Sequence, residues 1–264
     1  MVSAIAALLV AGILYSVVIE PQWIRHSHYD VAIPNLPKSF EGYTILHLSD
    51  FHGRVGAFSF LHKYRIQTDL VVITGDLFAW KTLPRSRIVR ALNSLVASDG
   101  VHYVSGNHDY RHGQLDVEPW EVGERLLDNR VVTLNRGQDT IWLAGIPDLV
   151  KGCPRLDEIV TQIPEGAPAI LLSHRPDAVL LPDARRFDLV LSGHTHGGQV
   201  TLWGHWVPVR HTRVGSRYVA GLWRNSTRTV LITSQGLGES ELPIRFGTRP
   251  EIVEIRLHGS RTAH

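Results

Sequence analysis

Apolar residues fill most of the first nineteen positions, and no charged side chain lies among them. A helix over residues 1–19 would be about 28 Å long, close to the ~30 Å hydrocarbon core of a bilayer. No Lys or Arg precedes the run and no small-x-small cleavage site follows it, which argues against a removed signal peptide. We therefore predict an uncleaved transmembrane anchor over residues 1–20, with a signal peptide or a buried core helix as the alternatives.

The next segment, residues 21–41, contains three prolines and is predicted to be a connector. Tyr15 and Trp23 flank the end of the apolar run, where aromatic rings favour the headgroup region of a bilayer. Arg25 and Lys38 lie on the C-terminal side of the run. Because basic residues favour the cytoplasmic side of a membrane, we expect the rest of the chain on the cytoplasmic face.

Residues 42–258 show no internal repeat, low-complexity tract or second linker, and are predicted to form one domain. Short apolar runs end repeatedly in polar clusters, which is typical of buried strands. These runs cover residues 43–48, 70–74, 101–105, 169–172 and 189–191. Helices are predicted between them, over residues 84–97, 118–127, 154–162 and 176–181. Strands and helices thus alternate, and in such sheets functional groups gather at the carboxyl ends of the strands.

After Gly197 the pattern changes to β-rich pieces. They cover residues 200–203, 217–220, 229–233 and 251–257. We expect these pieces to form a second sheet packed on the first. The predicted fold class is therefore α/β, with two packed mixed β-sheets flanked by helices and an N-terminal membrane helix.

The composition limits which partners and metal ligands the chain can have. Lys and Arg number 27 against 25 Asp and Glu, so no global positive field favours a nucleic-acid partner. Cys153 is the single cysteine, which excludes an intramolecular disulfide and a cysteine-based zinc site. The chain contains 15 histidines. Histidine is the commonest ligand of transition metals and the usual acid or base near neutral pH, so the positions of these residues matter.

Carboxylates, imidazoles and one amide gather at the five predicted strand ends. They are Asp50, His52, Asp76, Asn107, His108, His174, His194 and His196. Residues two apart on an extended segment point to the same side, so the Asp-x-His and His-x-His pairs can each reach one ion. Two pairs predict two divalent ions, and a carboxylate at the Gly-Asp turn could bridge them. Mixed nitrogen and oxygen ligands favour Mn, Fe or Zn.

Each of these residues also has an ordinary explanation when taken alone. Asp50, Asp76 and Asp109 could be turn or helix-capping residues, and His174 could be a satisfied polar group. It is the ordered set that favours a metal site. Histidines outside the set are predicted to serve packing or to lie at the surface; these are His47, His62, His102 and His112.

The order of the motifs Asp-x-His, Gly-Asp, Gly-Asn-His-Asp, a lone His and Gly-His-Thr-His resembles the calcineurin-like metallophosphoesterase superfamily, over residues 43–257. Gly-Gly-Gln at 197–199, Gly-Leu-Gly at 236–238, Pro-Ile-Arg at 243–245 and Arg-Pro-Glu at 249–251 are similar to its bacterial membrane-associated phosphodiesterase branch. That branch resembles the membrane-anchored UDP-2,3-diacylglucosamine pyrophosphatases. The resemblance implies an α/β/β/α sandwich and a bacterial inner-membrane location.

The resemblance also implies roles for the residues. Asp50, His52 and His196 would hold the first metal, Asn107, His174 and His194 the second, and Asp76 would bridge them. Two such ions activate water as the nucleophile and clamp the phosphoryl oxygens. His108 would steady or protonate the leaving oxygen, and Asp109 would orient His108. The interval between 43 and 76 is short for this family and leaves little room for a long helix, so we expect any departure from the family pattern in the local pocket and not in the fold.

Two basic stretches contain no acidic residue. Residues 200–228 carry five arginines, two histidines and three tryptophans, and could grip an anionic, amphipathic substrate or form a solvated hairpin face. The arginines are Arg210, Arg213, Arg217, Arg224 and Arg228. Residues 80–90 form the second stretch, which could rest on anionic lipid or be an ordinary basic helix face.

The leading hypothesis is thus a membrane-anchored dinuclear-metal phosphoesterase that hydrolyses a phosphodiester or pyrophosphate bond by metal-hydroxide attack. The anchor favours a lipid-linked or nucleotide-linked substrate such as UDP-2,3-diacylglucosamine. The alternatives are a phosphoprotein phosphatase or nuclease with the same site, and a non-catalytic metal-binding scaffold. Nuclease activity would require a longer basic groove than the even charge balance indicates.

Overall fold

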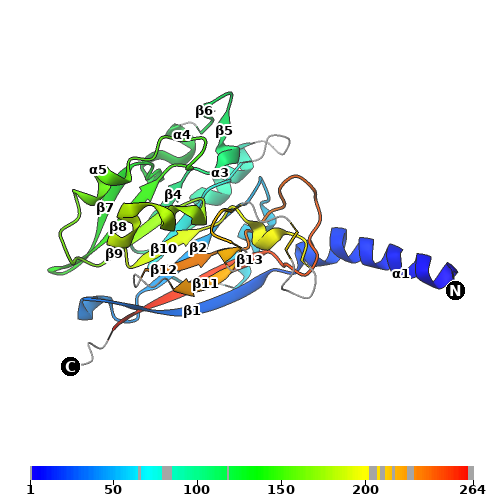
Figure 1. Ribbon diagram of the computed structural model, residues 1–264, viewed down its shortest axis with the longest axis horizontal. Coiled ribbons are helices and arrows are strands. Elements are labelled where there is room, and N and C mark those ends of the chain that lie inside the picture. Colours follow the sequence, from blue (N-terminus) through cyan, green and yellow to red (C-terminus); the bar gives the residue numbers. More distant parts are fainter. Residues whose placement is uncertain are drawn as a thin grey trace.

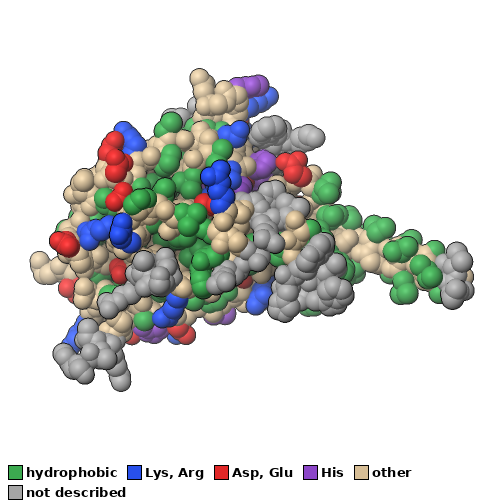
Figure 2. Space-filling view, viewed as in Figure 1, with side chains coloured by type: hydrophobic (Ala, Val, Ile, Leu, Met, Phe, Trp, Pro, Cys, Tyr) green, Lys and Arg blue, Asp and Glu red, His purple; other side chains and the backbone are tan. Residues whose placement is uncertain are grey.

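The computed structural model describes residues 2–64, 67–78, 85–117, 119–201, 207–208, 212–215, 218–224 and 229–260 (Figure 1). A helical segment opens the chain. It consists of α1 (Val2–Leu14), a π-helical turn η1 (Tyr15–Ile19) and a 3₁₀ turn η2 (Glu20–Gln22). This segment projects from the body of the protein, and its side chains are largely hydrophobic and exposed to solvent (Figures 1 and 2). The 20 residues Ser3–Gln22 are long and apolar enough to cross a membrane.

The first sheet has five strands in the order β1, β13, β2, β3, β4. Their bounds are β1 Arg25–Ile33, β13 Glu251–Gly259, β2 Thr44–Leu48, β3 Leu70–Thr74 and β4 Val101–Val104. Strands β2, β3 and β4 are parallel, β13 is antiparallel to β2, and β1 is parallel to β13. The sheet is therefore mixed, and its first strand in the sequence, β1, pairs with its last, β13.

The second sheet has six strands in the order β11, β12, β10, β9, β8, β7. Their bounds are β11 Gly221–Arg224, β12 Val230–Thr233, β10 Leu189–Ser192, β9 Ala169–Ser173, β8 Asp139–Ile146 and β7 Arg130–Arg136. The four central strands are parallel, and β11 and β7 are antiparallel to their neighbours.

Short helices connect the strands. The α-helices are α2 Gly56–Tyr64, α3 Arg85–Asn93, α4 Pro119–Val122 and α5 Leu156–Val160. The 3₁₀ turns are η3 Lys38–Phe40, η4 Asn107–Asp109, η5 Gly123–Arg125, η6 Pro176–Leu180, η7 Pro182–Arg186 and η8 His196–Gly198. A small hairpin of β5 (Tyr110–Arg111) and β6 (Gln114–Leu115) follows η4.

Side-chain alternation along the buried strands produces the layers. On β3, Leu70 and Val72 belong to the core between the two sheets, whereas Val71 and Ile73 pack in the core that includes α2 and α3. On β9, Leu172 faces the inter-sheet core and Leu171 faces the core that includes α5. Each sheet is thus covered by the other sheet on one face and by helices on the other, which confirms the predicted α/β/β/α sandwich (Figure 1).

Three elements differ from the prediction. The expected connector at 21–41 contains the nine-residue strand β1, whose outward His26, His28 and Asp30 hide the apolar pattern of its inner face. The hairpin β7–β8 was not predicted. Strand β13 lies in the first sheet and not in the second, because the C-terminal strand inserts between β1 and β2.

The predicted strands at 200–203 and 217–220 are only partly described. Val200 forms a single bridge with Phe246, and 218–220 form a turn that precedes β11. Residues 202, 203 and 217 lie outside the described residues.

Candidate metal centre

The predicted ligands meet at one edge of the sandwich because they follow the carboxyl ends of parallel strands. Asp50 and His52 follow β2, Asp76 follows β3, and the 3₁₀ turn η4 that begins at Asn107 follows β4. The second sheet supplies the remaining ligands, His174 after β9 and both His194 and His196 after β10. The two sheets therefore each contribute one part of the centre.

Five of these ligands have left-handed backbone conformations. The φ angles are 51° at Asp50, 45° at His52, 53° at Asp76, 71° at His194 and 50° at His196. Such a conformation costs roughly 1–2 kcal/mol per non-glycine residue. Clustering of this strain at a group of chemically active side chains is typical of functional sites.

Two glycines allow the loops to approach one another. Any side chain at Gly106 would overlap the Asp76 carboxylate, and any side chain at Gly193 would overlap the hydroxyl of Ser49 and the carboxylate of Asp50. The glycines of the Gly-Asn-His-Asp and Gly-His-Thr-His motifs are thus required by packing.

The first group of ligands consists of Asp50, His52 and His196, all of them buried. The Nε2 atoms of His52 and His196 lie 3.1 Å apart. Nε2 of His196 is also 3.4 Å from Oδ1 of Asp50. The three side chains thus direct ligand atoms at one point.

The second group consists of Asn107, His174 and His194. Nε2 of His174 lies 3.1 Å from Oδ1 of Asn107 and 3.1 Å from Nδ1 of His194. Asp76 lies between the two groups, because its Oδ2 atom is 3.5 Å from Nε2 of His52 and 3.4 Å from Nε2 of His174. The structure therefore brings all seven predicted ligands together, with Asp76 between the two groups. Its bridging role stays a prediction.

Main-chain contacts orient two of the imidazoles toward a cation. Nδ1 of His174 donates to the carbonyl of Thr74 at 2.8 Å, and Nδ1 of His196 donates to the carbonyl of Gly238 at 3.1 Å. With its proton on Nδ1, each ring presents an Nε2 lone pair to the centre. Nε2 of His174 then faces Oδ1 of Asn107, which is also a hydrogen-bond acceptor. Because two lone pairs at this distance repel each other, a cation or a proton must lie between the two atoms. The donor set fits divalent metal ions.

Burial and charge set the protonation of these groups. Burial lowers the pKa of His52 to about 4 and that of His196 well below its usual value, so both rings are neutral at pH 7. Burial raises the pKa of Asp50 to about 6. Burial opposes the charge of His174, but the neighbouring Asp76 carboxylate raises its pKa to about 10. A metal ion must therefore displace a proton from His174.

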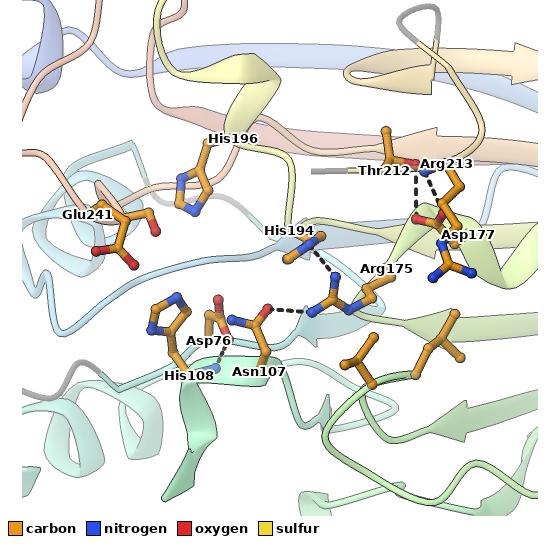
Figure 3. Close-up of a pocket in the computed structure, with 13 residues that line it drawn as sticks. Asp76, Asn107, His108, Arg175, Asp177, His194, His196, Thr212, Arg213 and Glu241 are labelled. Carbon is orange, nitrogen blue, oxygen red and sulfur yellow. Dashed lines mark hydrogen bonds between the residues drawn. The ribbon is translucent and has the colours of Figure 1, made fainter. Parts of the chain in front are cut away.

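The centre opens into a cavity of about 740 Å³ (Figure 3). Arg175 projects into it, and its guanidinium is held by the buried Asp148 carboxylate at 2.6 Å. The same guanidinium lies 2.7 Å from Nε2 of His194. Sequence reasoning missed Arg175, although it directly follows a predicted ligand. It brings a positive charge to the wall of the cavity, suited to an anionic oxygen.

His108 also lines the cavity. Its role at the leaving group stays a prediction. Its backbone N–H donates to Oδ1 of Asp76 at 2.8 Å, and its ring lies edge-on to the ring of His52 at a centroid distance of 4.8 Å. These contacts place the His108 ring beside the ligands.

Asp109 is buried beneath the same loops. Its carboxylate accepts hydrogen bonds from the backbone N–H groups of Asp76, Leu77, Phe78 and Gly106, at 2.7–3.3 Å. Asp109 therefore fixes the loop that carries Asp76 to the loop that carries Asn107. Its predicted role in orienting the His108 ring stays a prediction.

The other predicted features lie away from the centre or are incompletely described. His47 is buried inside β2, and His112 is exposed after β5. Arg213 lines the cavity, and its backbone N–H donates to Asp177 at 2.7 Å. The remainder of the basic stretches that falls outside the described residues includes Trp80, Trp203, His205, Arg210, Arg217 and Arg228.

Comparisons with known proteins agree with this geometry. The family model described as "Calcineurin-like phosphoesterase" matches residues 43–198. An uncharacterized metallophosphoesterase of Campylobacter jejuni is 34% identical over 246 residues, which cover 88% of this chain and 63% of that protein. The uncharacterized metallophosphoesterase YkuE of Bacillus subtilis is 29% identical, over 93% of this chain and 90% of its own length.

A zebrafish protein, the Danio rerio "Transmembrane protein with metallophosphoesterase domain", is 30% identical over 96% of this chain and 62% of its own length. The chain thus spans less than two thirds of the length of several relatives it matches. The family match covers more than half of the chain and includes all seven predicted metal ligands, which lie between residues 50 and 196. The chain belongs to the calcineurin-like phosphoesterase family.

Proposed function

We propose that this protein is a membrane-anchored, metal-dependent phosphoesterase that cleaves a phosphodiester or pyrophosphate bond with two divalent ions, Mn, Fe or Zn. The observation that carries the proposal is the position of Asp76 between two groups of three ligands at the floor of an open cavity. When bound, such ions polarise a phosphoryl oxygen and activate water.

The chain's own residues supply the remaining functions. Arg175 is held in a fixed direction by Asp148 and can bind a non-bridging phosphoryl oxygen. His108 lines the same cavity and can hold or deliver the proton that the leaving oxygen needs. Asp109 holds the loop that carries Asp76 at a fixed distance from the loop that carries Asn107.

A lipid-linked substrate is supported by a second, apolar cavity. It has a volume of about 270 Å³ and shares His196, Ser240 and Glu241 with the larger cavity. Leu242 and Ile244 line it. The segment that forms this wall contacts the end of the N-terminal helix, since the N–H of Arg245 donates to the carbonyl of Ser16 at 2.9 Å. An acyl group could leave the membrane beside the anchor and reach the metal centre from there.

The test is a hydrolysis panel with full-length protein in detergent and added Mn²⁺. UDP-2,3-diacylglucosamine or a dispersed phospholipid should be cleaved faster than a soluble chromogenic diester. The reverse ranking would refute the lipid-linked part of the proposal. Cleavage of none of them, with any of the three metals, would favour the non-catalytic scaffold.

The location is part of the same proposal: a single-pass anchor in the bacterial inner membrane, with the phosphoesterase domain on the cytoplasmic face. Arg25 and Lys38 support this orientation, because both follow the apolar helix. Protease added to spheroplasts should leave the domain intact, and digestion of the domain would contradict this orientation.

A further inference from the structure

A second cluster of potential metal ligands lies on the outer face of the first sheet, away from the phosphoesterase centre. His26 and His28 are two residues apart on β1 and point to the same side. Glu254, on the adjacent strand β13, is the register partner of His28. The cluster follows directly after the N-terminal helical segment.

The geometry of the three side chains matches a metal site. Oε2 of Glu254 lies 3.2 Å from Nε2 of His26 and 3.7 Å from Nδ1 of His28, and all three ligand atoms lie within 4.8 Å of one another. Tetrahedral zinc with bonds of about 2.0–2.2 Å separates its ligand atoms by roughly 3.3–3.6 Å. Small rotations of the exposed His28 ring would bring the three atoms to that separation.

Electrostatics also favour a cation at this point. The Glu254 carboxylate brings a negative charge beside both imidazole rings. Nε2 of His26 is shielded from solvent and makes no hydrogen bond within the described part of the chain, although a carboxylate oxygen lies 3.2 Å away. A lone pair or a poorly aligned N–H against a carboxylate is unfavourable, and a bound cation would satisfy both groups.

We propose that His26, His28 and Glu254 form a second, mononuclear site for a zinc-type divalent ion, separate from the phosphoesterase centre. Two imidazoles and one carboxylate suit Zn²⁺, Co²⁺ or Ni²⁺ better than Mg²⁺ or Ca²⁺, and the fourth position remains for water. The ion would fasten β1 to β13. Strand β1 is an edge strand of the sheet as described and connects the sheet to the anchor, so the ion would strengthen the attachment of the domain to its membrane helix.

The test is zinc stoichiometry of the full chain in detergent, measured by equilibrium dialysis after removal of metals with a chelator. Wild type should bind one Zn²⁺ more per chain than the H26A/H28A variant. At a zinc concentration about a hundred times the dissociation constant, the site should raise the Tm of wild type by about 5 °C relative to that variant. His28→Ala alone provides a milder variant, because this ring is exposed.

The matched control is His258→Ala. His258 lies on the same face of β13 and pairs with Glu41 and Asp30, so it tests whether any histidine beside carboxylates on this sheet binds zinc. The control should keep the wild-type stoichiometry. Equal zinc binding by wild type and H26A/H28A, or an equal loss in the control, would overturn the proposal.

This inference is independent of the proposed phosphoesterase activity. H26A/H28A should retain hydrolysis, because the altered residues lie outside the catalytic cavity. If the phosphoesterase centre bound no metal, wild type would still bind one ion that H26A/H28A lacks.

Discussion

Arg245 and His196 donate hydrogen bonds to the same main-chain oxygen, the carbonyl of Gly238, at 2.6 Å and 3.1 Å. Arg245 is fully buried and also donates to the carbonyls of Gln235, Gly236 and Thr248. The guanidinium therefore holds the loop whose carbonyl fixes the proton of His196, a predicted metal ligand. Arg245 is a positioning residue for the metal centre.

Arg245→Lys should weaken metal binding by about 10–100-fold, because a single ammonium group cannot reproduce the guanidinium's hydrogen bonds to the loop carbonyls, including that of Gly238. The measurement is a metal titration of full-length protein, with the free energy of unfolding determined in parallel. Arg256→Lys is the matched control, since Arg256 is exposed on β13. Unchanged metal affinity in a folded Arg245→Lys protein would contradict the positioning role.

The same loop attaches the N-terminal segment to the domain. The buried carboxylate of Glu20 accepts a hydrogen bond from the backbone N–H of Gly247 at 3.0 Å, and the rings of Tyr15 and Phe246 meet edge-on at 6.2 Å. Glu20→Ala leaves the N–H of Gly247 without this acceptor. We expect a loss of about 1–3 kcal/mol in the free energy of unfolding, measured by denaturant titration in detergent. Glu41→Ala, at an exposed position, should change stability far less, and equal effects would contradict this attachment.

His108 and the neighbouring Asp109 should respond differently to substitution. His108→Ala should lower kcat by about 10²–10⁴-fold while leaving metal content and Tm nearly unchanged, because the ring lines the cavity and seven other residues already supply the predicted ligands. Kinetics on a diester substrate, together with metal analysis, test this. Loss of metal in parallel with activity would show that His108 is a ligand instead.

Asp109→Ala should destabilise the folded protein by about 3 kcal/mol or more, because its carboxylate accepts from four buried backbone N–H groups. Burial and the nearby Asp76 raise the pKa of Asp109 to about 7, so the carboxyl is partly protonated at neutral pH. A protonated carboxyl still accepts hydrogen bonds, so these contacts persist. A stable Asp109→Ala protein with reduced kcat alone would favour the orienting role instead. Thermal unfolding and kcat together separate the two.

The metal centre was predictable because each ligand lies just after a strand, and the carboxyl ends of parallel strands meet at one edge. Strand-end position carries no information about β1, which is polar on its outer face and is flanked by Pro21 and Pro34. Arg175 was missed, and Arg245 was noted only as part of a family motif, for a different reason. Their roles depend on the hydrogen bonds of Arg175 to Asp148 and of Arg245 to the loop carbonyls and to Ser16 at the end of the N-terminal helical segment, and only the folded chain forms these contacts.

His47 provides a prediction about acid stability. It is fully buried in β2, where Nε2 contacts the hydroxyl of Thr74 at 2.9 Å, and burial lowers its pKa to about 3. In the unfolded chain its pKa is about 6.5, so between these values only the unfolded state takes up the proton. The stability that His47 contributes is therefore present above pH 6.5 and is lost as the pH falls toward 3. From pH 7 to pH 4, wild type should lose roughly 3 kcal/mol more than His47→Gln. Denaturant titrations of both proteins at the two pH values test this, and parallel losses would show that the ring is protonated in the folded state.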